Sequence, residues 1–174
     1  VDIEKLYDNV MNRYKYGGLD TPGLYLDETT LRTCYYHRRL FAQLAKELIK
    51  QGDHVRARKV LTYAEQAVPA YNVPEIYESG SFDIATAYAA LGEKTKAVTL
   101  FNHLIAESED YINWAFSLGN GRTGMMQNDC LYKFWQWNAY NERMKEIDKE
   151  SYEASNRRFE EKYALFTQII NNRN

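Results

Sequence analysis

Two stretches of this 174-residue chain share one spacing of apolar residues, glycine and alanine. In each stretch two large apolar residues lie four apart, a glycine follows four residues later, and an alanine comes five residues after the glycine. These positions are Leu44, Leu48, Gly52 and Ala57 in the first stretch and Ile84, Tyr88, Gly92 and Ala97 in the second. A spacing of four places side chains on one face of a helix, and glycine ends a helix at low cost because it adopts a left-handed backbone. The pattern therefore predicts two helical hairpins.

The first hairpin, within residues 29–69, resembles the tetratricopeptide repeat. It matches the family pattern at Phe41, Leu44, Ala45, Leu48, Gly52, Ala57, Leu61, Ala64 and Pro69. The second repeat, residues 78–109, departs from the pattern at Leu104, where the family has Ala, and at Glu109, where it has Pro. The resemblance implies a right-handed array of antiparallel helix pairs. Residues 70–80 lie between the two repeats, and we expect them to form an extra turn or loop.

The rest of the chain is also helical in pattern. Apolar residues at helical spacing predict helices over residues 3–14, 125–144 and about 149–170. Glycine and proline mark turns in the lead-in, where Asp27 can cap the next helix, and predict a loop at 120–124. No stretch alternates like a strand, so the sequence predicts one all-α domain over 1–174. Its parts are a lead-in (1–28), repeat 1 (29–69), repeat 2 (78–109) and C-terminal helices (111–174), the ends acting as caps.

Composition limits the possible partners. The net charge of -2 and the pI near 6.0 do not favour nucleic acid or an anionic membrane surface. No run approaches 18 apolar residues, so we expect no direct membrane insertion. Two cysteines do not make a disulfide scaffold.

Catalytic and metal motifs are poorly supported. Cys34 and His37 lie three apart on a predicted helix and could face one ion, but we favour a buried thiol beside a packed imidazole. Sequence spacing assembles no set of nucleophile, base and orienting residue. We therefore predict no catalytic, metal or cofactor-binding residues and no enzymatic activity for this domain.

The predicted concave surface is the strongest candidate site. In tetratricopeptide arrays the first helix of each pair lines this surface, which binds peptides. On that register the groove residues are Arg39, Gln43, Lys46, Lys50, Phe82, Asp83 and Thr86. The family's clamp for a C-terminal carboxylate is absent, since Ala42 stands where it uses Lys and Lys46 where it uses Asn. An ordinary solvated helix face explains the basic residues equally well.

A second candidate is the aromatic run around residues 134–140. Trp135, Trp137 and Tyr140 could form a platform for a sugar ring or a peptide. Two apolar stripes, however, run along this helix. Leu131, Phe134 and Trp135 form one, and Trp137, Tyr140, Met144 and Ile147 form the other. We therefore favour a helix that packs on both sides within the core.

Four passages carry a further resemblance, namely residues 6–20, 25–28, 38–45 and 68–74. They are similar to the C-terminal region of a large bacterial family of multi-span membrane proteins of unknown function. The N-terminal part of that family resembles protein O-mannosyltransferase-type glycosyltransferases. The resemblance implies that this chain is the soluble tail of such a protein, and no catalytic residue carries over to it. Because the chain begins at Val1, we also expect a fragment or a processed product.

These observations leave three functional hypotheses. The first is an accessory domain of a membrane-attached glycosyltransferase-like protein, on the periplasmic side by analogy or else cytoplasmic. It would bind a protein partner, an acceptor or its own membrane domain. The second is a free-standing adaptor that binds peptides, and the third is a sugar-binding domain that uses the aromatic platform.

Overall fold

The computed structural model describes residues 2–171, which form helices joined by turns and contain no strand. This confirms the all-α class. The contacts divide the chain into two compact units, Val1–Ala97 and Val98–Asn174. The single domain expected from the sequence remains a prediction. None of the helices in residues 2–171 is long and apolar enough to cross a membrane.

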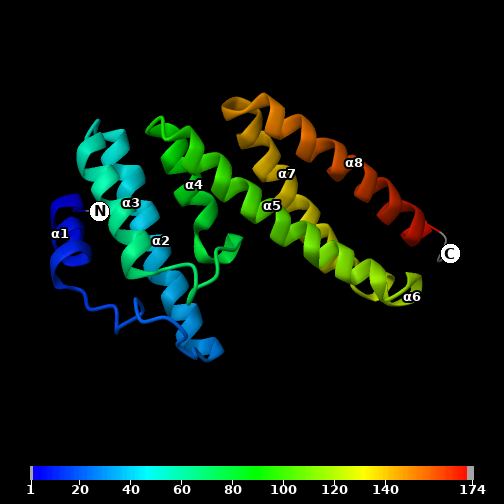
Figure 1. Cartoon of the computed structure of the whole chain (residues 1–174), viewed down its shortest axis with the longest axis horizontal. Coiled ribbons are helices and arrows are strands. Elements are labelled where there is room, and N and C mark those ends of the chain that lie inside the picture. The colour runs from blue at the N-terminus through cyan, green and yellow to red at the C-terminus, as the bar shows by residue number, and fades with distance from the viewer. Residues whose placement is uncertain (1, 172–174) are drawn as a thin grey trace. The chain divides into compact units, whose positions relative to one another are not determined.

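The first unit holds the lead-in and the first predicted repeat (Figure 1). Its elements are α1 (Ile3–Asp8), the π-helix η1 (Asn9–Arg13), α2 (Glu28–Lys50), α3 (His54–Ala67), the 3-10 helix η2 (Tyr77–Ser79) and α4 (Ser81–Ala90). The α5 helix (Lys94–Ser117) begins in this unit. The second unit adds α6 (Asn120–Met125), α7 (Gln127–Ile147) and α8 (Lys149–Asn171).

The α2–α3 hairpin forms where the repeat pattern predicts it. Gly52 has a positive φ of 79°, and its N–H donates to the Ile49 carbonyl at 3.0 Å. The N–H of Asp53 donates to the Leu48 carbonyl at 2.9 Å, which completes a Schellman stop. The turn at Gly92 has the same two bonds, from Gly92 to Ala89 and from Glu93 to Tyr88. A glycine therefore ends the first helix of each hairpin, α2 and α4, as the spacing predicts.

Packing explains the other repeat positions. Leu44, Ala45 and Leu48 of α2 are fully buried, as are Ala57 and Leu61 of α3, and α2 contacts both α3 and α4. Asp27 caps α2 by accepting from the Thr29 and Thr30 N–H groups. The α3 helix ends at Ala67, two residues before Pro69. Residues 70–80 form the expected turn, with η2 inside it.

In the second unit, α7 and α8 pack against each other and run antiparallel (Figure 1). The Trp137 Nε1–H donates to Ser155 Oγ at 2.8 Å, and Ser155 Oγ donates to Asn141 Oδ1 at 2.6 Å. The ring of Phe159 lies edge-on to the rings of Phe134 and Trp137. The Trp137 stripe therefore packs as the core interpretation expects.

Two local predictions for this unit are wrong. Residues 120–124 form the start of α6 instead of a loop, because the Thr123 hydroxyl is buried and donates to the Ala115 carbonyl at 2.7 Å. The predicted second core stripe of α7 is only partly buried, since Leu131 and Trp135 are exposed while Phe134 is buried. The buried seam instead follows Cys130, Phe134, Trp137, Asn141 and Met144.

Candidate functional site

Four of the seven predicted groove residues meet at one hollow between α2 and α4. Arg39, Gln43 and Lys46 project from exposed positions of α2, and Asp83 comes from the first turn of α4. Ala42 and Glu47 complete the lining of this hollow, which has a volume of about 360 Å³. The spacing of three and four along α2 places its members on one face of the helix.

A second hollow continues along α2 from Arg39, which lines both. It has a volume of about 490 Å³, and its apolar lining comes from Leu31, Tyr35 and Ile76. Glu28, Arg32 and Glu78 supply its polar lining. We call the two hollows together the α2 groove. A polar half is thus joined to a more apolar half through one arginine.

The other three predicted residues line neither hollow. Lys50 forms an ion pair with Glu47 at 2.6 Å. Phe82 is half-buried and its ring lies against Tyr77, while the Thr86 hydroxyl donates to the Phe82 carbonyl at 2.9 Å. Local partners engage these three side chains, and their place in the groove remains a prediction.

The cations of the α2 groove differ in their pairing. Arg32 lies within 2.6 Å of Glu28, one turn away. Arg39 and Lys46 form no ion pair with residues 2–171, although both are exposed. The Arg39 guanidinium lies 5.9 Å from the centre of the Tyr36 ring. Arg39 and Lys46 lie two turns apart on α2 and share the first hollow with the carboxylates of Glu47 and Asp83. Each cation can therefore pair with an anionic group of a ligand without breaking an existing ion pair.

Arg38 holds the wall of the α2 groove, and sequence analysis did not single it out. It is 5% exposed, and its guanidinium donates four hydrogen bonds. The acceptors are the carbonyls of Val68, Val73 and Pro74 and the hydroxyl of Ser79, at 2.6–2.9 Å. Burial lowers the pKa of Arg38 to about 10, so it stays charged at neutral pH. Arg38 therefore fixes the segment that carries Ile76 and Glu78 into the second hollow.

The α4 helix approaches the α2 backbone at Gly80. Its φ is 84°, and a Cβ placed there would lie 2.6 Å from Arg39 Cγ and 3.1 Å from Arg39 Cα. Only glycine fits this contact without displacing Arg39. Gly80 thus sets the distance between the two helices that form the hollow of 360 Å³.

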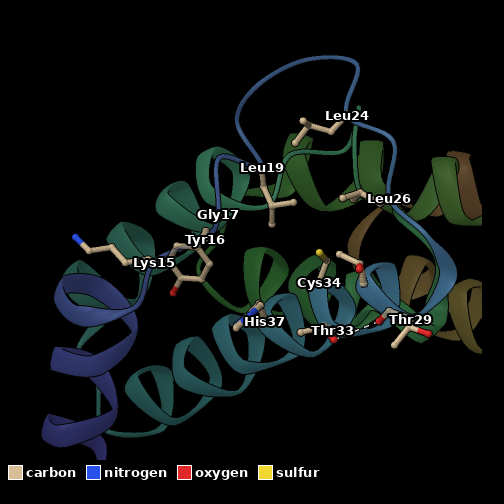
Figure 2. A pocket seen from close by; sticks show the side chains of 11 residues that line it. Lys15, Tyr16, Gly17, Leu19, Leu24, Leu26, Thr29, Thr33, Cys34 and His37 are labelled. Atoms are coloured by element: carbon tan, nitrogen blue, oxygen red, sulfur yellow. Dashed lines mark hydrogen bonds between the residues drawn. The ribbon is translucent and has the colours of Figure 1, made fainter.

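A third cavity lies under the lead-in, on a different face of α2. Figure 2 shows Leu19, Leu24 and Leu26 on one side and Thr33, Cys34 and His37 of α2 on the other. Its volume is about 490 Å³. We call it the lead-in pocket. Cys34 is buried and free, and His37 is half-buried with its ring edge-on to Tyr16 at 5.4 Å. No group of three His, Cys, Asp or Glu side chains able to hold a metal ion occurs in the described chain.

The structure separates the members of the predicted aromatic platform. Trp137 and Tyr140 are fully buried, so they belong to the core and offer no surface. Trp135 is 52% exposed and stacks instead on Tyr132, which is 45% exposed. The two ring centres are 5.7 Å apart with an interplanar angle of 12°. Sequence spacing of three could have identified this pair.

No protein-family model, no curated protein and no solved structure matches this chain.

Proposed function

We propose that this chain is a non-catalytic, tetratricopeptide-like interaction domain whose α2 groove binds an extended protein segment. The proposal assigns an acidic side chain of that segment to Arg39 and Lys46. An apolar side chain would occupy the second hollow, against Leu31, Tyr35 and Ile76. The observation that carries the proposal is the pair of exposed cations without ion-pair partners in the described chain. Both line the first hollow, and Arg39 also lines the second.

The repeat pattern also supports this assignment. Both first helices end in the same glycine turn, and the predicted repeat positions of α2 and α3 are buried. In helical-repeat domains the concave face is a common peptide-binding surface. Most of the other basic side chains along α2 and α3 already have carboxylate partners, including Arg32, Lys50 and Arg56. Binding of an acidic segment therefore requires no existing ion pair to break at Arg39 or Lys46.

Selection from a phage-displayed library of random dodecapeptides tests the proposal. We expect enriched peptides to carry Asp or Glu together with a large apolar residue. Arg39→Ala and Lys46→Ala should each weaken a selected peptide about tenfold, which corresponds to about 1.4 kcal/mol. Added salt should weaken binding further, since exposed charge pairs are screened.

The matched control is Lys59→Ala, which removes an exposed lysine from α3. It should leave the affinity unchanged. Selected peptides without acidic residues, or equal losses in all three variants, would contradict the proposed groove.

The family resemblance supports a more specific setting. We propose that the domain is the C-terminal part of a glycosyltransferase-like membrane protein, on the periplasmic side, where it binds a partner, an acceptor or its own membrane domain. An antibody raised against this chain should detect a band far above 20.4 kDa in the membrane fraction of the source cells. A band near 20.4 kDa outside that fraction would instead support the free-standing adaptor.

Sugar binding is a second candidate function, and the exposed Tyr132–Trp135 stack favours it. Aromatic faces of this kind pack against the apolar faces of sugar rings. Titration with soluble mannan should quench tryptophan fluorescence in the wild-type protein and not in Trp135→Ala. The control is Trp114→Ala, because Trp114 is also exposed. A flat wild-type titration would remove this candidate.

A further inference from the structure

The lead-in pocket has walls that are held in place from both sides. The Asn72 amide donates to the carbonyls of Leu19 and Thr21 at 2.7 and 2.6 Å, and the Tyr71 hydroxyl donates to the Asp20 carbonyl. At the other end of the lead-in, the Tyr16 hydroxyl donates to the Val10 carbonyl at 2.7 Å. The cavity is therefore formed before any ligand arrives, which lowers the entropic cost of binding.

The chemistry inside the pocket is neutral. Burial raises the pKa of the Cys34 thiol and lowers that of the His37 imidazole, so both are uncharged at neutral pH. Lys15 also lines the pocket, but Figure 2 shows its ammonium group turned away from the other lining side chains. Within residues 2–171, no carboxylate lines the cavity. A charged ligand would lose part of its hydration there without gaining an opposite charge.

The polar groups of the pocket favour a hydroxyl donor. The hydroxyls of Thr30 and Thr33 donate to Asp27 and to the Thr29 carbonyl, and both oxygens keep acceptor lone pairs. The buried Nδ1 atom of His37 has no hydrogen-bond partner in the described chain. The facing leucines offer only apolar contact. The pocket thus combines hydroxyl acceptors on α2 with an apolar opposite wall.

We infer that the lead-in pocket binds a small, uncharged hydroxyl compound with an apolar body, such as a phenol or a short alcohol. Its volume of about 490 Å³ lies within the usual range of small-molecule sites, about 300–1,000 Å³. This site lies on another face of α2 than the α2 groove and does not depend on the proposed function. It would give the domain a second ligand.

Binding of p-cresol, followed by amide chemical shifts of the whole chain, tests this inference. We expect saturable shifts at Gly17, Thr33 and Cys34. The charged analogues of similar size, 4-methylbenzoate and 4-methylbenzylammonium, should bind at least about tenfold more weakly because they would bury an unpaired charge. Leu24→Ala should weaken p-cresol binding about threefold, since Leu24 is only half-covered and its truncation removes wall contacts without opening the core.

The control is Leu165→Ala, which truncates a similarly exposed leucine of α8 and should leave the affinity unchanged. Shifts that do not saturate, or that fall outside the pocket, would overturn the inference. Equal binding of the carboxylate analogue would overturn the neutral class of ligand. Loss of peptide binding in the Arg39→Ala variant does not affect this outcome, because Arg39 does not line the lead-in pocket.

Discussion

Arg38 and Arg39 are neighbours in sequence with opposite roles. Arg38 turns inward and donates to three backbone carbonyls and one hydroxyl, while Arg39 turns outward and lines both hollows of the α2 groove. One helical step of about 100° separates the two directions. The buried arginine organises residues 68–79, and the exposed one faces the proposed ligand. Stability and binding are thus divided between adjacent positions.

Arg38→Met should destabilise the first unit by about 3 kcal/mol. Each buried acceptor left without a donor costs about 1–3 kcal/mol, and removal of the buried charge offsets part of that cost. Urea unfolding measures the change. Arg32→Met is the control, because Arg32 lies on the same helix in an exposed ion pair worth less than about 1 kcal/mol. Equal effects of the two substitutions would contradict the role assigned to Arg38.

At the scale of elements, the helix junctions at Gly52 and Gly80 have similar backbone angles but differ in how much room surrounds the glycine. Both residues have positive φ, 79° and 84°, so alanine is strained by about 1–2 kcal/mol at either position. A Cβ at Gly52 meets no atom within 4 Å, whereas one at Gly80 meets the α2 backbone at Arg39. Of these two glycines, only Gly80 is therefore required for the packing of α4 on α2.

Gly80→Ala should cost about 1–3 kcal/mol more than Gly52→Ala, because overpacking adds to the backbone strain. It should also weaken the selected groove peptides, since Arg39 must move. Thermal unfolding and peptide affinity measure the two effects, with Gly52→Ala as the control for strain alone. If both variants lose equal stability and keep full affinity, α4 does not set the shape of the α2 groove.

Structural features that depend on residues close together in the sequence were predictable. The glycine stops, the Asp27 cap and the α2 and α3 faces follow from spacing within a few residues. The Arg38 contacts were not predictable, since an arginine on a helix is usually exposed and its acceptors lie 30–41 residues away. The α6 helix was missed for a similar reason, because Asn and Gly indicate a turn and the contact with Ala115 is tertiary. No periodic sequence pattern marks the residues that line the lead-in pocket.

Across the whole molecule, acidification protonates two sets of groups in separate pH ranges. Burial holds the pKa of His37 below its ordinary value of 6.5. Hydrogen bonds from Thr30 and Arg56 hold the pKa values of the capping carboxyls Asp27 and Asp53 below 3.8. In both cases the unfolded chain binds protons at a higher pH than the folded chain. Stability is therefore complete above the unfolded pKa and is lost as the pH falls through the folded one.

The free energy of unfolding should consequently fall in two stages on acidification. The first stage begins below about pH 6.5 as the unfolded chain protonates His37, and the second begins below about pH 4 with the capping carboxyls. Denaturant unfolding measured at intervals from neutral to acid pH should show both stages in the wild type. His37→Gln should remove the first and keep the second, because glutamine does not titrate. His54→Gln, which replaces an exposed histidine at the start of α3, should keep both. If the free energy of unfolding of the wild type and of His37→Gln depends on pH in the same way, the surroundings do not hold the imidazole neutral. That result would remove one argument for an uncharged ligand in the lead-in pocket.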